Sequence, residues 1–248
     1  MRLLTTGILV FASACIGAIT APAVLAAEGA ALAPYKATYI TKAMGMKVRI
    51  ERELVTTDEG YRLTSNGKSM LAKINESARF SLDGEDVQGI DYQYQLKSVV
   101  RRKREVIFLP EAGVINSFKK GEWTEHKWSE GVLDQLSQQE QLRLDLKSAA
   151  QTSDVPPDTL KFRVVDGPRI KDRTLKFVGQ ETLSTPMGDV LSLHYKQLRS
   201  PTATRRSAVW IAPSLDYLMV RTQHIEDDST IEISLESLSR PNTAATRL

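Results

Sequence analysis

Most of the chain alternates apolar and polar residues, and short turn-forming clusters separate the alternating segments. In residues 35–42, for example, Tyr35, Ala37 and Tyr39 alternate with polar neighbours. A period of two places every second side chain on the same face of a β-strand, so one face is buried and the other contacts water. Hairpin spacing without intervening helices predicts an antiparallel sheet. We expect about eleven strands, at residues 35–42, 46–57, 61–71, 73–83, 90–109, 160–167, 169–183, 189–198, 205–213, 216–225 and 229–238.

Residues 129–151 break this alternation. The segment has no Gly or Pro after its third residue and is rich in Leu, Gln, Glu, Lys and Arg, which are good helix formers. We therefore predict a helix at 131–149, ended by the prolines at 156 and 157, although L-R-L-D-L within it also fits a strand. The side chains expected to pack on the sheet are Leu133, Leu136 and Leu144. The predicted fold is mainly β, a single strongly curved antiparallel sheet or open barrel with one central helix.

The N-terminus has the layout of a secretory signal peptide. One cation, Arg2, precedes an uncharged run from Leu3 to Ala27, with Val24 and Ala26 at the −3 and −1 positions of a cleavage site. An uncleaved membrane anchor is the alternative, because the run is long enough to span a bilayer. Lipidation of Cys15 is a third option, because A-S-A-C loosely resembles a lipoprotein signal.

Cleavage would divide the chain into a signal peptide (1–26), a single β-rich envelope domain (27–240) and a flexible C-terminal tail (241–248). The expected location is the periplasm, with a membrane-anchored form as the alternative. The mature chain would have no cysteine, since Cys15 is the only one in the sequence. Disulfides and Cys-based zinc sites are then excluded, and the hydrophobic core must hold the fold.

The overall charge argues against nucleic acid as a partner. The chain has 33 Lys and Arg against 30 Asp and Glu, a net charge of +3, whereas nucleic-acid-binding proteins usually have a clustered basic excess and a recognisable motif.

Four consecutive cations at 101–104 form the main candidate binding site. Strand parity places Arg102 and Arg104 on one face and Arg101 and Lys103 on the other. This run is either a solvated strand end that resists edge-to-edge aggregation, or a basic rim that binds an anionic ligand through bidentate arginine contacts. In the second interpretation, the further arginines that could join the rim are Arg205 and Arg206.

Aromatic residues form the second candidate site. Tyr92 and Tyr94 share one strand face, and Trp123 and Trp128 flank His126 just before the predicted helix. Such a tryptophan pair forms a carbohydrate platform or pocket mouth, or it fills the gap where a helix packs on a sheet.

Motifs of catalytic or metal-binding sites are missing from the sequence. The three histidines stand on separate segments, and the chain has no G-x-S-x-G and no Gly-rich phosphate loop. We therefore predict no catalytic residue, metal ligand or cofactor, and a protein that is not an enzyme.

Several segments together resemble a known family. They are the early Y-K-A-T-Y-I-T-K, the central L-D-Q-L-S-Q-Q-E-Q-L-R-L, and T-P-M-G-D-V-L-S-L-H-Y-K-Q followed by R-R-S-A-V-W-I-A-P-S-L-D-Y-L-M-V-R-T. This series resembles the bacterial exported-protein family catalogued as domain of unknown function 3108, over roughly residues 34–239. One departure is Met219, which follows Tyr217-Leu218 where such proteins often have proline. The resemblance implies an exported β-rich envelope protein and supplies no reaction or catalytic residues.

These observations predict a non-enzymatic periplasmic protein that binds an apolar or anionic amphiphilic ligand, such as an envelope lipid or glycan, inside the curved sheet. The alternatives are a structural or assembly factor that contacts an envelope protein, and a glycan or peptidoglycan hydrolase. A cavity with an apolar wall would favour ligand binding, and two carboxylates facing each other in a cleft would favour hydrolysis.

The signal-peptide interpretation predicts a mature protein that begins near Ala27 or Glu28. N-terminal sequencing of the protein released by cells that express the full chain checks this. Retention of Met1, or a lipid on Cys15, would contradict it.

Overall fold

A computed structural model of the chain describes the core of the sequence. The described residues are 32–43, 46–70, 72–200, 202–227 and 229–241, without the side chains of Ala43 and Met46. The predicted signal peptide, its cleavage site and residues 242–248 of the predicted tail lie outside the described residues.

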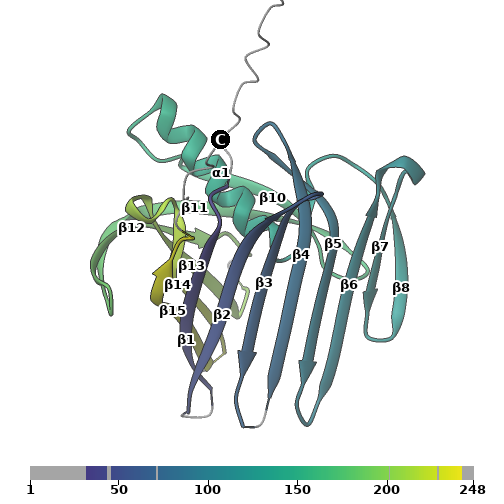
Figure 1. The fold of residues 1–248 in the computed structure, drawn as a ribbon, viewed down its shortest axis with the longest axis horizontal. Coiled ribbons are helices and arrows are strands. Elements are labelled where there is room, and N and C mark those ends of the chain that lie inside the picture. The colour runs from purple at the N-terminus through teal and green to yellow at the C-terminus, as the bar shows by residue number, and fades with distance from the viewer. Residues whose placement is uncertain (1–31, 44–45, 71, 201, 228, 242–248) are drawn as a thin grey trace, which may run out of the picture.

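The described residues form one open sheet of 15 strands together with a single α-helix and two 3-10 helices (Figure 1). The strands are β1 (Tyr35–Ala43), β2 (Met46–Thr57), β3 (Gly60–Lys68), β4 (Lys73–Asp83), β5 (Asp86–Lys97), β6 (Arg101–Leu109), β7 (Val114–Lys119), β8 (Glu122–Lys127), β9 (Val132–Leu133), β10 (Thr159–Val165), β11 (Ile170–Thr185), β12 (Gly188–Gln197), β13 (Arg205–Ala212), β14 (Leu218–Glu226) and β15 (Ser229–Ser239). The helices are η1 (Pro110–Ala112), α1 (Ser137–Thr152) and η2 (Pro213–Leu215).

The sheet consists of two meanders, β1 to β8 and β9 to β15, which are joined by the pairing of β1 with β15. It runs β8-β7-β6-β5-β4-β3-β2-β1-β15-β14-β13-β12-β11-β10-β9. The first strand therefore pairs with the last, antiparallel, and the two edges of the sheet are β8 and β9. The pairing of β9 with β10 is parallel, so the sheet is not antiparallel throughout.

The prediction of about eleven strands is wrong in number, although the mainly β class is confirmed. The segment predicted as one strand at 90–109 is divided into β5 and β6 by a turn at 98–100. That turn reads S-V-V and has none of the Gly, Pro, Asn or Asp residues that usually mark turns. The other unpredicted strands are β7, β8 and β9.

The helix begins later than predicted. It spans Ser137–Thr152 rather than 131–149, because Val132–Leu133 pair with β10 as β9. The chain then turns on Asp134, whose carboxylate accepts the backbone N–H groups of Leu136 at 2.7 Å and Ser137 at 2.9 Å. Burial raises the pKa of Asp134 to about 6 in spite of these hydrogen bonds. The leucines predicted to pack on the sheet, Leu133, Leu136 and Leu144, are all buried. Leu133 and Leu136 precede the helix, and only Leu144 lies within it.

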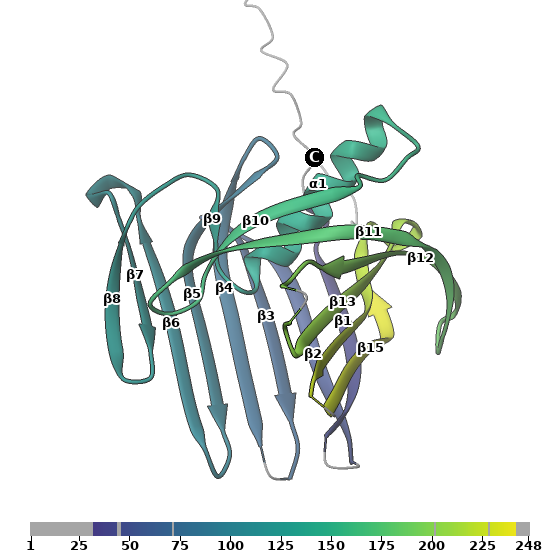
Figure 2. The same ribbon diagram turned by 180° about the vertical axis from the view of Figure 1, so that it is seen from behind.

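The sheet curves around α1, which lies at one end of the curved sheet between the N-terminal strands and β10–β11 (Figures 1 and 2). The hydrophobic core takes large buried side chains from both halves of the sheet, among them Tyr35, Phe80, Leu63 and Tyr195. Polar residues of the helix are buried as well, which requires them to find hydrogen-bond partners on the sheet.

Side chains also connect the two ends of the curved sheet. The turn between β10 and β11 docks against β7, where the Ser117 hydroxyl donates to the Gly167 carbonyl at 2.7 Å. Lys119 forms an ion pair with Asp166 at 2.5 Å. Burial would raise the pKa of Asp166, but hydrogen bonds from Lys119 and Lys171 hold it well below its usual value. The close approach requires glycine, since a Cβ at Gly167 would lie 2.8 Å from the Cβ of Lys119.

We expect Gly167→Ala to destabilise the protein more than Gly84→Ala. The φ angles are nearly equal, +60° and +59°, so both variants carry the left-handed cost of about 1 kcal/mol. Only at Gly167 does the new methyl group meet a neighbour, which should add about 1–3 kcal/mol as in other overpacked sites. Urea denaturation measures both, and equal losses would mean that this docking does not hold the sheet ends together.

Candidate functional site

A cavity of about 420 Å³ lies inside the curved sheet, below the N-terminal part of α1. The inward-facing side chains of β1–β6 line one wall, and those of β11–β15 line the opposite wall. Leu142 of the helix and the glutamines at 135, 138 and 139 complete the lining. The volume falls within the range of ordinary small-molecule sites, about 300–1,000 Å³.

Three arginines bring positive charge into this cavity: Arg52 from β2, Arg104 from β6 and Arg173 from β11. Among the described residues, none of the three has a carboxylate oxygen within 4 Å of its guanidinium nitrogens. Arg52 is buried, and Arg104 and Arg173 are half-buried. A buried charge without a partner is costly, so these groups need other partners or a ligand.

Glutamine side chains hold two of these arginines. Arg52 donates to Gln139 at 2.5 Å and Arg173 donates to Gln138 at 2.8 Å. The buried Nε of Arg52 has no hydrogen-bond partner within the described part of the chain. Burial lowers the pKa of Arg173, and the positive charge of Arg104 lowers it further.

One carboxylate, Glu76, lies in the cavity lining. It accepts a hydrogen bond from the Tyr92 hydroxyl at 2.6 Å. Burial raises the pKa of Glu76, while this hydrogen bond and the charges of Arg52 and Arg104 oppose the shift. One carboxylate faces three guanidinium groups in the lining, so the cavity keeps a positive balance.

Apolar side chains form the rest of the wall. From both halves of the sheet and from the helix they are Ile50, Ile74, Leu142, Leu175, Val209, Met219 and Ile233. Tyr39 and Tyr94 add aromatic surface, and the guanidinium of Arg104 lies 5.4 Å from the Tyr94 ring centroid. Cationic and apolar surfaces therefore face the same space, which suits a molecule with one anionic and one apolar part.

Comparison with known proteins places the chain in a family. The family described as "Protein of unknown function (DUF3108)" matches residues 34–236. The chain belongs to this family. No curated protein matches the sequence. The fold is similar to a solved crystal structure, the beta-barrel-like protein of domain of unknown function DUF1849 from Brucella abortus. The two share 12% identity at a TM-score of 0.55, over 86% of this chain and 99% of the other. At this identity the similarity concerns the fold alone.

In this member of the family, three of the predicted site residues lie together in the cavity: Arg104, Tyr92 and Tyr94. Arg102 has the same strand parity as Arg104 but is exposed at the end of β6, outside the lining. Arg205 and Arg206 are also exposed, and Arg205 pairs with Glu226. The expectation that these three arginines join the site is therefore corrected.

The two predicted tryptophans do not come together at the cavity either. Trp123 on β8 is half exposed and packs against the Phe118 ring, with centroids 5.3 Å apart. Trp128 packs against the hydrophobic core beyond the end of β8. Neither residue lines the cavity, so they form no shared platform there.

Sequence reasoning missed Arg52, Glu76, Arg173 and the helix glutamines. The signal for Arg52 is its parity, since it follows Val48 and Ile50 on the same strand face. Arg173 shares parity with Leu175 in the same way. The glutamines gave no signal, because their burial depends on a sheet that surrounds the helix.

The three histidines have different surroundings in the structure. His224 lines the cavity and contacts the Ser207 hydroxyl at 2.9 Å, whereas His194 stacks on Trp210 and His126 contacts the Gly167 carbonyl. In the described part of the chain, no three His, Cys, Asp or Glu side chains group closely enough to hold a metal ion. No helix among the described residues is long and apolar enough to cross a bilayer.

We expect Glu76→Gln to gain stability relative to the parent as pH rises. Because the folded-state pKa of Glu76 is raised, the folded protein binds more protons than the unfolded chain above pH 4.5, and stability falls with pH in that window. Glutamine can still accept from Tyr92 but does not ionise. Urea denaturation of both proteins at pH 4.5 and pH 7.5 tests this. If the stability of Glu76→Gln relative to the parent were lower at pH 7.5 than at pH 4.5, the raised pKa of Glu76 would be contradicted.

Proposed function

We propose that the protein is a non-enzymatic component of the bacterial envelope that binds an anionic amphiphile, a lipid or lipid-linked glycan, in the cavity of the curved sheet. The observation that carries this proposal is the convergence of Arg52, Arg104 and Arg173 on a space that also has an apolar wall. The signal-peptide pattern of residues 1–26 supports an envelope location.

Charge chemistry favours an anion as the polar part of this ligand. Guanidinium groups bind carboxylates and phosphates through paired N–H donors, and such charge-assisted bonds strengthen where water is excluded. Arg52 is buried and has an N–H group without a partner among the described residues, so an anion would supply what the protein does not. The apolar wall removes hydrocarbon from water, at about 25 cal/mol per Å² buried.

The alternative functions find less support in the cavity. A glycan hydrolase would require two facing carboxylates, and Glu76 is the single carboxylate among the lining residues. An assembly factor would not need a cavity of this size. A cavity lined by three arginines, an apolar wall and a single carboxylate therefore favours ligand binding over both.

Native mass spectrometry of the protein purified from its own envelope tests the proposal directly. We expect an adduct with the mass of an anionic amphiphile, lost when the charge of the cavity is removed. A protein that never carries such an adduct, and that binds no anionic amphiphile when one is supplied, would overturn the proposal.

We further expect Arg104→Gln to weaken binding of dodecyl phosphate at least about tenfold, the loss of one charge-assisted bond of about 1.5 kcal/mol. Lys103→Gln is the matched control, because this neighbouring side chain points to the opposite face and pairs with Glu105. Titration calorimetry at fixed salt measures both variants, since salt screens any charge change. Dodecyl maltoside, with the same chain and no charge, should bind both equally. Equal loss from both variants would indicate diffuse electrostatics.

A further inference from the structure

Two neighbouring hairpins expose apolar side chains at the end of the sheet opposite α1. The β3–β4 turn exposes 91% of Met70, and the β5–β6 turn exposes 100% of Val99 and 54% of Val100. These turns lie at the lower edge of Figure 1, where the strands project farthest from the helix. Exposed apolar residues are common singly, but a turn tip is where a soluble protein normally places polar residues or glycine.

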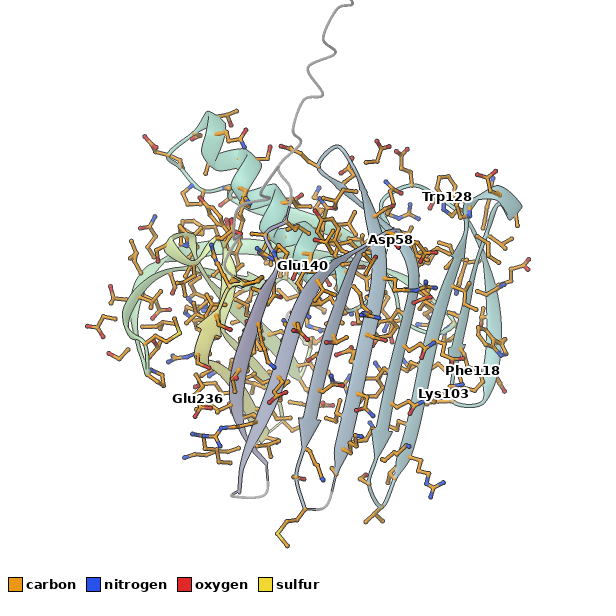
Figure 3. The ribbon with its side chains drawn as sticks, in the orientation of Figure 1. Asp58, Lys103, Phe118, Trp128, Glu140 and Glu236 are labelled. Carbon is orange, nitrogen blue, oxygen red and sulfur yellow. The ribbon has the colours of Figure 1, made fainter. Side chains whose placement is uncertain are left out.

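Turns at the other end of the same strands follow the usual rule. They read Asp-Glu-Gly at 58–60, Asp-Gly-Glu-Asp at 83–86 and Pro-Glu-Ala-Gly at 110–113. In Figure 3, Asp58 lies near this acidic end and Lys103 lies toward the opposite one. The apolar tips are therefore specific to one end of the sheet and are not a general property of its turns.

A row of cations lies directly behind the apolar tips. Strand register places Lys68 opposite Lys73, Lys73 opposite Lys97, and Lys97 opposite Arg101. All four are exposed and share one face. Like charges directly opposite each other on neighbouring strands destabilise a sheet. Such a row is therefore costly in the free protein, and an anionic partner would offset that cost.

Both turns hold their apolar residues in place. In the first, the Ser69 N–H donates to the Ala72 carbonyl at 2.8 Å, and the Ala72 N–H donates to the Ser69 hydroxyl. In the second, the Ser98 hydroxyl donates to the Val100 carbonyl at 2.8 Å and accepts the Val100 N–H. Met70 and Val99 are thus exposed next to residues that are held by hydrogen bonds.

We infer that this surface, called here the hairpin end (Met70, Val99, Val100 and the cations Lys68, Lys73, Lys97 and Arg101), docks onto an anionic lipid bilayer. The apolar tips enter the headgroup region, and the cation row contacts lipid phosphates. A bilayer fits better than a protein because the apolar residues are few and bracketed by charge. A stable protein interface usually buries more than about 1,000 Å² around a contiguous apolar centre.

The neighbouring β1–β2 connection has a similar sequence pattern, K-A-M-G-M-K at 42–47. Residues 44–45 lie outside the described part, so the hairpin end is defined by the other two turns. The inference goes beyond the proposed function and does not require the cavity to hold a ligand.

A fluorescent label tests the insertion directly. An environment-sensitive fluorophore is attached at Val99→Cys in a Cys15→Ser background of the full chain, and a matched label is placed at Glu111→Cys, exposed at the opposite end. With vesicles of equal parts phosphatidylcholine and phosphatidylglycerol, we expect a blue shift at position 99 and none at position 111. Both proteins share residues 1–31, so attachment through that segment alone would not distinguish the labels. Equal responses, or no response at position 99, would overturn the inference.

Charge variants test the cation row with the same signal. Each cation near an anionic surface contributes about fivefold to binding, so replacing Lys68, Lys73, Lys97 and Arg101 with glutamine should weaken insertion by more than about tenfold. The control replaces the same number of exposed cations elsewhere, at Lys36, Arg62, Lys127 and Lys161, and should lose much less. Equal losses would overturn the role of the row.

The hairpin-end variants keep Arg104 and should bind dodecyl phosphate like the parent. Loss of vesicle insertion with normal dodecyl phosphate binding therefore separates this inference from the proposed function. Insertion that fails even in the parent would reject the bilayer as partner and leave a protein as the occupant of the hairpin end.

Discussion

Glu140 and Arg143 form an ion pair inside the curved sheet, where only 1% and 3% of these residues are exposed. Tyr35 of β1 donates to Glu140 at 2.9 Å, and Arg143 donates to Asp216, between η2 and β14, at 2.7 Å. The pair thus ties α1 to strands from both halves of the sheet. Burial opposes the charge of Arg143, but Glu140, Tyr35 and Asp216 hold its pKa above the usual value. Removing one partner of such a pair generally costs about 3–5 kcal/mol, because the other charge remains buried.

This polar attachment determines how the interior is filled. Gln141 accepts the Val87 N–H at 2.7 Å, while Gln138 and Gln139 bind Arg173 and Arg52 from opposite walls. An apolar helix could sink into the sheet until the walls met. A helix whose polar groups each require a partner at hydrogen-bond distance stays where those partners are. The hydrogen bonds that hold the helix therefore also hold two arginines toward the cavity, so the stability of the fold and the chemistry of the site depend on the same contacts.

Strand periodicity predicted most of the fold, because a half-buried strand alternates apolar residues on its buried face with polar residues on its exposed face. It failed at residues 98–100, where the turn S-V-V has no Gly, Pro, Asn or Asp, and before the helix, where β9 pairs with a strand distant in sequence. The same periodicity placed Arg104 with Arg102 on one strand face. It could not tell that Arg104 lines the cavity and Arg102 does not, since parity gives the face of a strand and not the depth. Arg173 and Arg104 line the same cavity because the strand pairing brings β11 and β6 to opposite walls, and no local sequence pattern predicts that pairing.

The location of the cavity relative to the hairpin end gives the two proposals a common physical basis. Gly67 and Ile74 line the cavity and are the immediate neighbours of Lys68 and Lys73 in the cation row. The polar turns and the buried helix are at the far end of the strands (Figure 1). The buried ion pair of Glu140 and Arg143 lies on that helix, whereas the cavity lining extends to the strand ends beside the cation row. Under the two proposals, an amphiphile taken from a bilayer would therefore pass from lipid to cavity at the end of the sheet that carries the apolar tips.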